Sequence, residues 1–476
     1  MLRSILLVVA AAGALAQPGG NGETLQRLVQ LNVAATDAKR GPVTDLRASD
    51  IQVREDGKVR PVVFLRGAGP ERALMPLGDG DTANRPAVTP TLILFDRWNE
   101  RITTASLAWA GLGNALQRLE SVESIYIYFL TSQRELFPVH PLPPSNADLR
   151  ALPEPTPAQL RSELDDAVRK LNGLRGAEVQ DQILRANTTF RALSALGSQM
   201  AAMAGRKNLI WVTRGFPLTL NDQSGTIDLT PQVRELSLAA AQSGIAIYTV
   251  DEPPDMTTDL GSSYRDTLEM FSSLTGGRFY SSDEIPGALA DALADGRGSY
   301  RLAYYSVARS NDRKEHKIRL ESPRKGVHLL AREGYFGAGP NPDEVENSLF
   351  TSVPHSPFDA SEIGLRVAVS RAASSPATHF SIHVDPADVL LEQHDGTYQG
   401  QLALLFGFYS HGFFERAPKA IDVDVRLTPG QFSQAQKDGI DVSQDVAVTS
   451  DAEKIRVIVM DRKLYALGSV TVSALK

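Results

Sequence analysis

Hydrophobic and polar positions follow different periods in successive segments of this chain, and these periods predict how it is organised. In residues 27–66, apolar and polar residues alternate with the period of two that is typical of half-buried strands, and residues 299–336 return to strand patterns. In residues 90–297, short and continuously apolar runs alternate with helical patterns. In residues 363–476, short strand patterns recur at regular intervals and the helical signal is weak. We therefore expect one α/β segment flanked by β segments.

The central segment has the alternation of strands and helices that favours a doubly wound, mostly parallel sheet with helices on both faces. Its strands are predicted at 91–96, 124–130, 207–213 and 245–250, with a further strand at 134–139 paired to the second of these. Its helices are predicted at 105–119, 158–171, 181–203, 231–243 and 262–275.

The β segment at 27–66 is too small to bury a hydrophobic core by itself. We expect it to pair with the β segment at 299–336, so that the α/β domain (90–297) is an insertion in a small β-sandwich. Stretches rich in Gly, Pro and Asp at 67–89 and 337–360 are predicted to be linkers. Residues 363–476 are predicted to form a second, immunoglobulin-like β-sandwich.

The first 16 residues have the pattern of a secretory signal peptide. A positive charge at Arg3 precedes an apolar run from Ile5 to Leu15, and Ala14-Leu15-Ala16 satisfies the small-residue rule for cleavage before Gln17. The alternative is an uncleaved N-terminal anchor, although the run is too short for a spanning helix. We expect an exported bacterial protein, periplasmic or secreted, with no membrane span after cleavage.

Composition narrows the classes of function. The length of 476 residues suggests about three domains. The net charge of −7 gives no support to a nucleic-acid partner, which would need a basic face. The sequence contains no cysteine, which removes a disulfide framework, thiol catalysis and thiolate metal sites.

The candidate site lies at the end of the first predicted strand of the central segment. The run Leu92–Phe95 is continuously apolar and is followed by Asp96. Open α/β sheets bind their ligands outside the carboxyl ends of the strands. Asp96 therefore occupies the position at which chemistry is expected, and its neighbours decide which chemistry is possible.

Several segments, by their order and spacing, resemble the von Willebrand factor A-related (VWFA) proteins abundant in Acidobacteria, over nearly the whole chain. The matching segments are Asn32-Val33, Gly41–Leu46, Asp50–Gly57, Leu92–Asp96, Gly205–Ile210, Leu274–Phe279 and Arg332–Tyr335. The resemblance implies a Rossmann-like α/β domain of the von Willebrand factor A (VWA) type. Such domains usually bind a divalent cation at a metal-ion-dependent adhesion site. There Mg²⁺ is held by oxygen ligands and keeps one position open for an acidic group of the partner.

This chain departs from the metal-binding pattern that the resemblance implies, which is Asp-x-Ser-x-Ser, a later Thr and a final Asp. Asp96 matches the first position, but Trp98 and Glu100 stand at the two serine positions. The loop 175–178 offers no Thr, and Arg214 stands where the final Asp should be. We therefore expect no Mg²⁺ and no other cofactor. Asp96 is expected to cap the next helix or to pair with Arg214. Our hypothesis is that Arg214 replaces the metal and that Trp98 covers the pair.

The remaining candidates for chemistry lack the required spacing or context. The eight histidines show no His-x-x-x-His or similar ligand spacing. The acidic pairs Asp165-Asp166 and Asp251-Glu252 could serve acid–base catalysis, but solvated or capping carboxylates are commoner. No Gly-x-Ser-x-Gly elbow and no phosphate-binding loop is present.

The sequence is compatible with three functions. The favoured one is an exported, non-enzymatic binding or adhesion module for an unknown protein or glycan of the cell envelope. It would use a degenerate, metal-free adhesion site formed by Asp96, Trp98, Glu100 and Arg214. The second is a hydrolase that uses the carboxylates of Asp96 and Glu100, which would need divergent pKa values. The third is a structural subunit of a cell-envelope assembly, which would form a stable oligomer.

Overall fold

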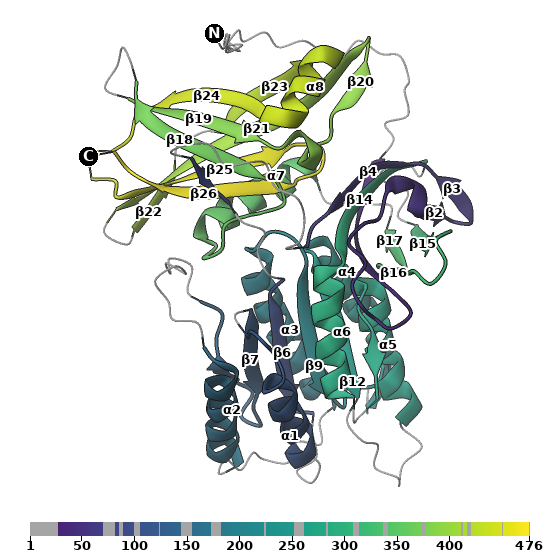
Figure 1. The fold of residues 1–476 in the computed structure, drawn as a ribbon. Coiled ribbons are helices and arrows are strands. Elements are labelled where there is room, and N and C mark those ends of the chain that lie inside the picture. The colour runs from purple at the N-terminus through teal and green to yellow at the C-terminus, as the bar shows by residue number, and fades with distance from the viewer. Residues whose placement is uncertain are drawn as a thin grey trace.

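The computed structural model shows a mixed α/β protein with many β-sheets (Figure 1). It describes residues 27–69, 81–84, 89–99, 105–122, 124–143, 155–172, 182–222, 225–251, 261–281, 284–307, 314–336, 341–372, 377–410, 413–416, 420–449 and 451–475. The predicted signal peptide (1–16), the candidate Glu100 and the loop 175–178 lie outside the described residues. Within those residues, no helix is both long enough and apolar enough to cross a membrane.

A six-stranded sheet forms the centre of the α/β part. Its strand order is β13-β12-β9-β6-β7-β8, and every neighbouring pair is parallel except β7 with β8. The strands are β6 (Thr91–Asp96), β7 (Ile125–Leu130), β8 (Leu136–His140), β9 (Lys207–Thr213), β12 (Ile245–Asp251) and β13 (Phe279–Tyr280). The four main strands predicted for this sheet are present, with ends shifted by at most one residue.

Helices cover both faces of this sheet. They are α1 (Ala105–Leu116), α2 (Pro157–Asn172) and α6 (Ile285–Arg297) on one face, and α3 (Gln182–Ala201), α4 (Thr230–Gln242) and α5 (Gly261–Thr275) on the other. β6 is continuously apolar because it is buried on both sides. Leu92 and Leu94 pack into the core with α3, α4 and α5, whereas Ile93 and Phe95 pack into the core with α1, α2 and α6.

Four elements of the α/β part were missed by the sequence prediction: α6, β13, and the two strands of a hairpin, β10 (Thr219–Asp222) and β11 (Gly225–Asp228). α6 begins with Ile285-Pro286-Gly287 and contains few large apolar residues, so its helical period is weak. It forms because Leu289 and its neighbours are buried in the core between the sheet and the helices α1 and α2. Tertiary packing therefore overrides the poor local propensity of this segment.

Two four-stranded sheets contain the strands of both residues 27–66 and residues 299–336. Their orders are β16-β1-β14-β4 and β17-β15-β2-β3. The strands are β1 (Arg27–Thr36), β2 (Gln52–Glu55), β3 (Lys58–Arg60), β4 (Val62–Gly67), β14 (Ser299–Ser306), β15 (Glu315–Glu321), β16 (His328–Leu330) and β17 (Gly334–Phe336), with a short 3-10 helix at Ala48–Asp50. β1 pairs antiparallel with β14, β2 pairs with β15, and one core contains residues of both segments.

Two further sheets form the C-terminal β part, with strand orders β24-β19-β18-β5 and β20-β21-β25-β26; β22 and β23 also pair with β21. The strands are β5 (Thr82–Ala83), β18 (Leu365–Arg371), β19 (Thr378–Val384), β20 (Glu392–His394), β21 (Thr397–Ser410), β22 (Phe413–Arg416), β23 (Ile421–Leu427), β24 (Ile440–Val446), β25 (Lys454–Asp461) and β26 (Leu467–Ser473). The two sheets share one core, in which the rings of Phe380 and Phe406 lie 4.9 Å apart.

The segments predicted as linkers contain regular structure, which corrects that prediction. β5 lies within 67–89 and pairs with β18. α7 (Pro342–Ser352) lies within 337–360, and a 3-10 helix at Val353–His355 follows it. The Asn341 side chain caps α7 by accepting a hydrogen bond from the Asp343 N–H at 3.1 Å. Asn followed by Pro is a recognised helix-start signal, and the polar composition of the segment concealed it. A further helix, α8 (Pro429–Asp438), and a 3-10 helix at Pro386–Asp388 lie among the C-terminal strands.

The amino edge of the six-stranded sheet faces the rest of the molecule. Lys207, the first residue of β9, is 2% exposed, and burial lowers its pKa to about 8 although the charge of Glu362 opposes the shift. Glu362 also lies 3.4 Å from Arg301 of β14, measured from Oε1 to NH1. Because β6, β7, β9, β12 and β13 are parallel, their carboxyl ends lie at the opposite edge of the sheet. That carboxyl edge points away from the other four- and six-stranded β-sheets of the molecule (Figure 1).

Candidate functional site

The carboxyl edge of the six-stranded sheet has a topological switch point between β6 and β9. From β6 the chain continues to β7 on one side, and from β9 it continues to β12 on the other. Ligands of open α/β sheets bind in the crevice outside such a point. The register pairs Phe95 with Val212, so the next residues, Asp96 and Thr213, lie opposite each other on the same face.

The Asp96 carboxylate at this point is buried and accepts four hydrogen bonds. The side chain is 1% exposed. Its Oδ1 accepts from the Asn99 backbone N–H at 3.1 Å, and its Oδ2 accepts from Asn99 Nδ2 at 2.6 Å, Trp211 Nε1 at 3.3 Å and Thr213 Oγ1 at 2.9 Å. Burial raises the pKa of Asp96 above its ordinary value, and the hydrogen bonds from Asn99, Thr213 and Trp211 oppose that rise.

Asn99 extends this network to helix α3. Its Nδ2 also donates to Thr189 Oγ1 at 2.7 Å, and that hydroxyl donates to the Arg185 carbonyl one turn earlier at 3.1 Å. We call Asp96, Asn99, Thr189, Trp211 and Thr213 the crest cluster. All five side chains are buried, so the cluster joins β6, β9 and α3 inside the protein.

Trp98 lies in the hydrophobic core and does not cover a pair of Asp96 with Arg214, which corrects that prediction. Its side chain is 3% exposed and packs with residues of α3. The Arg185 guanidinium lies 5.4 Å from the centroid of the Trp98 ring and also donates to the Trp98 carbonyl. Trp98 therefore anchors the turn after β6 beneath α3.

Arg214 does not replace a metal by pairing with Asp96, which corrects the second part of the hypothesis. Among the described residues, the partners of the Asp96 carboxylate are Asn99, Trp211 and Thr213. The charge of Arg214 acts on Asp251 at the end of β12, where burial raises the pKa of Asp251 to about 6 and Arg214 opposes the rise. The strand register explains the error, because it places the hydroxyl of Thr213 opposite Asp96.

The crest cluster does not fit the Mg²⁺ site that the resemblance implies. Mg²⁺ requires near-octahedral oxygen ligands. Here N–H groups of Asn99 and Trp211 point at the Asp96 oxygens, where a cation would have to bind. In the part of the chain that the structure describes, no group of three or more His, Asp or Glu side chains could hold a metal ion.

The sequence reasoning found Asp96 and missed the other members of the crest cluster. Thr213 ends a correctly predicted strand, and Trp211 lies two residues earlier on the same face, so the register of β6 with β9 would have revealed both. Asn99 and Thr189 gave no comparable signal, because no spacing rule says which turn of α3 faces the end of β6.

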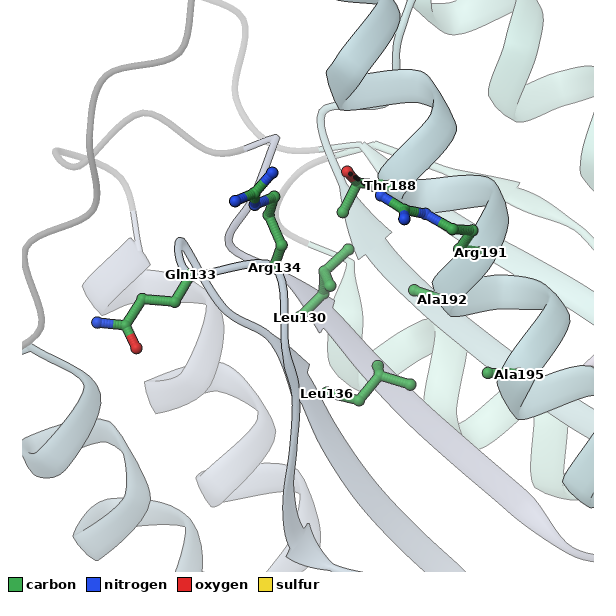
Figure 2. Close-up of a pocket in the computed structure, with 8 residues that line it drawn as sticks. All are labelled: Leu130, Gln133, Arg134, Leu136, Thr188, Arg191, Ala192 and Ala195. Carbon is green, nitrogen blue, oxygen red and sulfur yellow. Dashed lines mark hydrogen bonds between the residues drawn. The ribbon is translucent and has the colours of Figure 1, made fainter.

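A groove of about 440 Å³ lies beside the crest cluster, between the β7–β8 turn and α3 (Figure 2). It is lined by Leu130, Gln133, Arg134, Leu136, Thr188, Arg191, Ala192 and Ala195. Figure 2 shows Arg134 and Arg191 on opposite sides of one end of the groove with Thr188 between them, whereas Leu136 and Ala195 lie toward the other end and Gln133 points away. Thr188 directly precedes Thr189 of the crest cluster. We call this feature the carboxyl-edge groove.

The turn that carries Arg134 has an unusual backbone conformation. The Thr131 N–H donates to the Glu135 carbonyl and the Arg134 N–H donates to the Thr131 carbonyl, each at 2.9 Å. Arg134 has a φ of 68°, in the left-handed region. Hairpin loops of this length usually place Gly at the left-handed position. A residue with a side chain costs about 1–2 kcal/mol there.

Comparisons with known proteins place this chain in no family. No family model and no curated protein matches the sequence. The human COPII-coat protein Sec24c aligns at 12% identity with a TM-score of 0.26, over 57% of this chain and 49% of that one. The pilus adhesin SpaC from Lactobacillus rhamnosus GG, in its open conformation, aligns at 9% identity with a TM-score of 0.29, over 91% of this chain and 61% of that one. A second SpaC structure aligns at 10% identity with a TM-score of 0.27, over 91% of this chain and 58% of that one. This chain thus spans about half to three fifths of the length of these structures.

Proposed function

We propose that this chain is an exported, non-enzymatic binding module whose VWA-like α/β domain recognises its partner without a metal ion. The observation that carries the proposal is the set of four hydrogen bonds that the buried Asp96 carboxylate accepts. Four donors from the chain itself occupy the carboxylate that would otherwise be the first ligand of a cation. Binding at this edge of the sheet would therefore not depend on Mg²⁺.

The same geometry opposes the hydrolase alternative. A general acid or base must reach the proton that it transfers, directly or through one water. Asp96 is 1% exposed, and its oxygens are engaged by Asn99, Trp211 and Thr213. Using it in catalysis would require breaking hydrogen bonds to a charged group, each worth about 1.5–3 kcal/mol.

The orientation of the sheet supports the carboxyl edge as the binding face. The amino edge faces the rest of the molecule, and the charge of Glu362 acts on Lys207 there. The carboxyl edge lies at the far end of the parallel strands and carries the carboxyl-edge groove. A structural subunit of an envelope assembly would instead need a large self-complementary surface, and light scattering of the purified chain would show a stable oligomer.

Capture from the cell envelope tests the proposed function. The full chain is immobilised and exposed to an envelope fraction, once with Mg²⁺ and once with a chelator. We expect the same partner to be retained in both conditions and to elute with unchanged mass. Capture that disappears with the chelator and returns with Mg²⁺ would contradict the metal-free module. A partner that elutes cleaved would favour the hydrolase.

A further inference from the structure

We propose that the carboxyl-edge groove binds a carboxylate side chain on an extended acidic segment of a partner protein, and that Arg134 and Arg191 are its receptors. This inference rests on the proposed binding function and names the site and the chemistry of the partner. It depends on three features of the groove: the conformation of Arg134, the donors left on Arg191, and the aliphatic lining.

Arg134 presents a guanidinium that the described fold does not use. The side chain is exposed, and among the described residues it makes no ion pair. Arg40 provides an internal comparison, because it also adopts a left-handed conformation, with a φ of 62°. The Arg40 guanidinium, however, forms an ion pair with Asp291, which gives its side chain a role in the fold. Residues with strained backbone conformations cluster at functional sites. We therefore assign the Arg134 guanidinium a role in ligand binding.

Arg191 faces Arg134 from α3 and is also exposed. Its one hydrogen bond among the described residues runs from NH2 to Thr188 Oγ1 and is long, at 3.4 Å. A guanidinium carries several N–H donors in a fixed fork, so most donors of Arg191 are left for a ligand. Two guanidinium groups at one end of a groove can meet both oxygens of a carboxylate. None of the eight lining residues is acidic, so no carboxylate in the lining competes for them.

The rest of the lining favours a peptide over an acidic glycan. Leu130, Leu136, Ala192 and Ala195 provide an aliphatic surface beside the arginines, which suits an aliphatic side chain next to the acidic residue. This aliphatic surface offers no hydrogen-bonding group to the hydroxyl groups of a sugar ring, so it adds little to the recognition of a glycan. Addition of the peptide as a strand to the neighbouring edge strand β8 is not favoured, because Pro138 in that strand has no N–H to donate. Recognition would therefore rest on side chains.

Fluorescence anisotropy with a defined peptide tests the groove. The probe is a labelled peptide in which one Glu is flanked by Leu and Val, and the reference probe has Gln in place of Glu. The full chain is compared with Arg134→Gly, Arg191→Ala and a matched control, Arg118→Ala. Arg118 is an exposed arginine just after α1, where the chain returns from the carboxyl edge of the sheet toward the amino edge. We expect the Glu peptide to bind, with an affinity that falls at high salt. Each groove variant should weaken binding about tenfold or more, as expected for loss of a charge-assisted hydrogen bond. The control should bind as the wild type does.

Several results would overturn this assignment. They are a Glu peptide that does not bind at about 1 mM, a Gln peptide that binds equally well, and groove variants that bind as tightly as the wild type. Polygalacturonate that binds in place of the peptide, with the same sensitivity to Arg134→Gly, would replace the peptide by an acidic glycan. Capture of the envelope partner by the Arg134→Gly, Arg191→Ala double variant would refute the groove and leave the proposed function standing. A requirement for Mg²⁺ in the wild type would instead refute the proposed function.

Discussion

Replacing Thr213 with valine tests the crest cluster, because the change removes a hydroxyl group and almost no volume. Thr213 is fully buried. Its Oγ1 donates to Asp96 Oδ2 at 2.9 Å and accepts from the Gly215 N–H at 2.9 Å. Losing a hydrogen bond to a charged group costs about 1.5–3 kcal/mol, and leaving a buried N–H without a partner costs about 1–3 kcal/mol. Because the two effects overlap, we expect Thr213→Val to lower the free energy of unfolding by about 2–4 kcal/mol.

Tryptophan fluorescence can follow the unfolding of the α/β part separately. All three tryptophans, Trp98, Trp109 and Trp211, lie between residues 90 and 297. Urea unfolding monitored by their emission therefore reports on that part of the molecule. Thr213→Ser is the matched control, since it keeps the hydroxyl and loses one methyl group, for which we expect about 0.5–1.5 kcal/mol. A valine variant no less stable than the serine variant would refute the role of this hydroxyl.

Two buried ionisable groups and one strained residue allow further tests. Burial lowers the pKa of Lys207 from 10.5 to about 8, so between these values the unfolded chain binds the extra proton and stability should rise with pH. Lys207→Met should abolish that rise, as urea midpoints at about pH 7.5 and about pH 9.5 would show; an equal rise in both proteins would contradict it. Burial raises the pKa of Asp251 from 3.8 to about 6, so the folded chain binds the extra proton between these values and stability should fall as pH increases. Asp251→Asn should flatten the urea midpoints over this range, and an unchanged decline would exclude Asp251 as its source. Arg134→Gly should leave the free energy of unfolding unchanged or raise it by about 1 kcal/mol, because it relieves the left-handed strain; a loss greater than about 1 kcal/mol would contradict the strain argument.

The α/β part could be predicted from the sequence because its strands are buried on both faces. The run Leu92–Phe95 and the other continuously apolar runs are short and end at polar residues, which distinguishes them from helices. α6 could not be predicted, because its alanines and glycines give no clear helical period of apolar residues. Only packing against the sheet makes this segment a helix. α7 carried a recognisable start at Asn341-Pro342, but its polar composition is equally typical of a linker.

Only one residue of the candidate site could be predicted from the sequence. Asp96 follows from the rule that ligands gather at the carboxyl ends of parallel strands. Its true partners depend on the register of β6 with β9, which the sequence does not specify, and a shift of one residue replaces Arg214 by Thr213. The carboxyl-edge groove is harder still to foresee, because Arg134 and Arg191 belong to a turn and a helix that meet only in the folded protein.

The stability of the α/β part in the presence of Mg²⁺ tests the metal-free site most directly. A ligand that binds only the folded state stabilises it by about 2.7 kcal/mol at one hundred times its dissociation constant. Urea unfolding is followed by tryptophan fluorescence without divalent cations and with about 10 mM Mg²⁺, a concentration about one hundred times a dissociation constant of about 0.1 mM. Because Asp96 is buried and its carboxylate already accepts four hydrogen bonds from the chain, the two unfolding curves should coincide. A stabilisation by Mg²⁺ that Asp96→Asn abolishes would contradict the account.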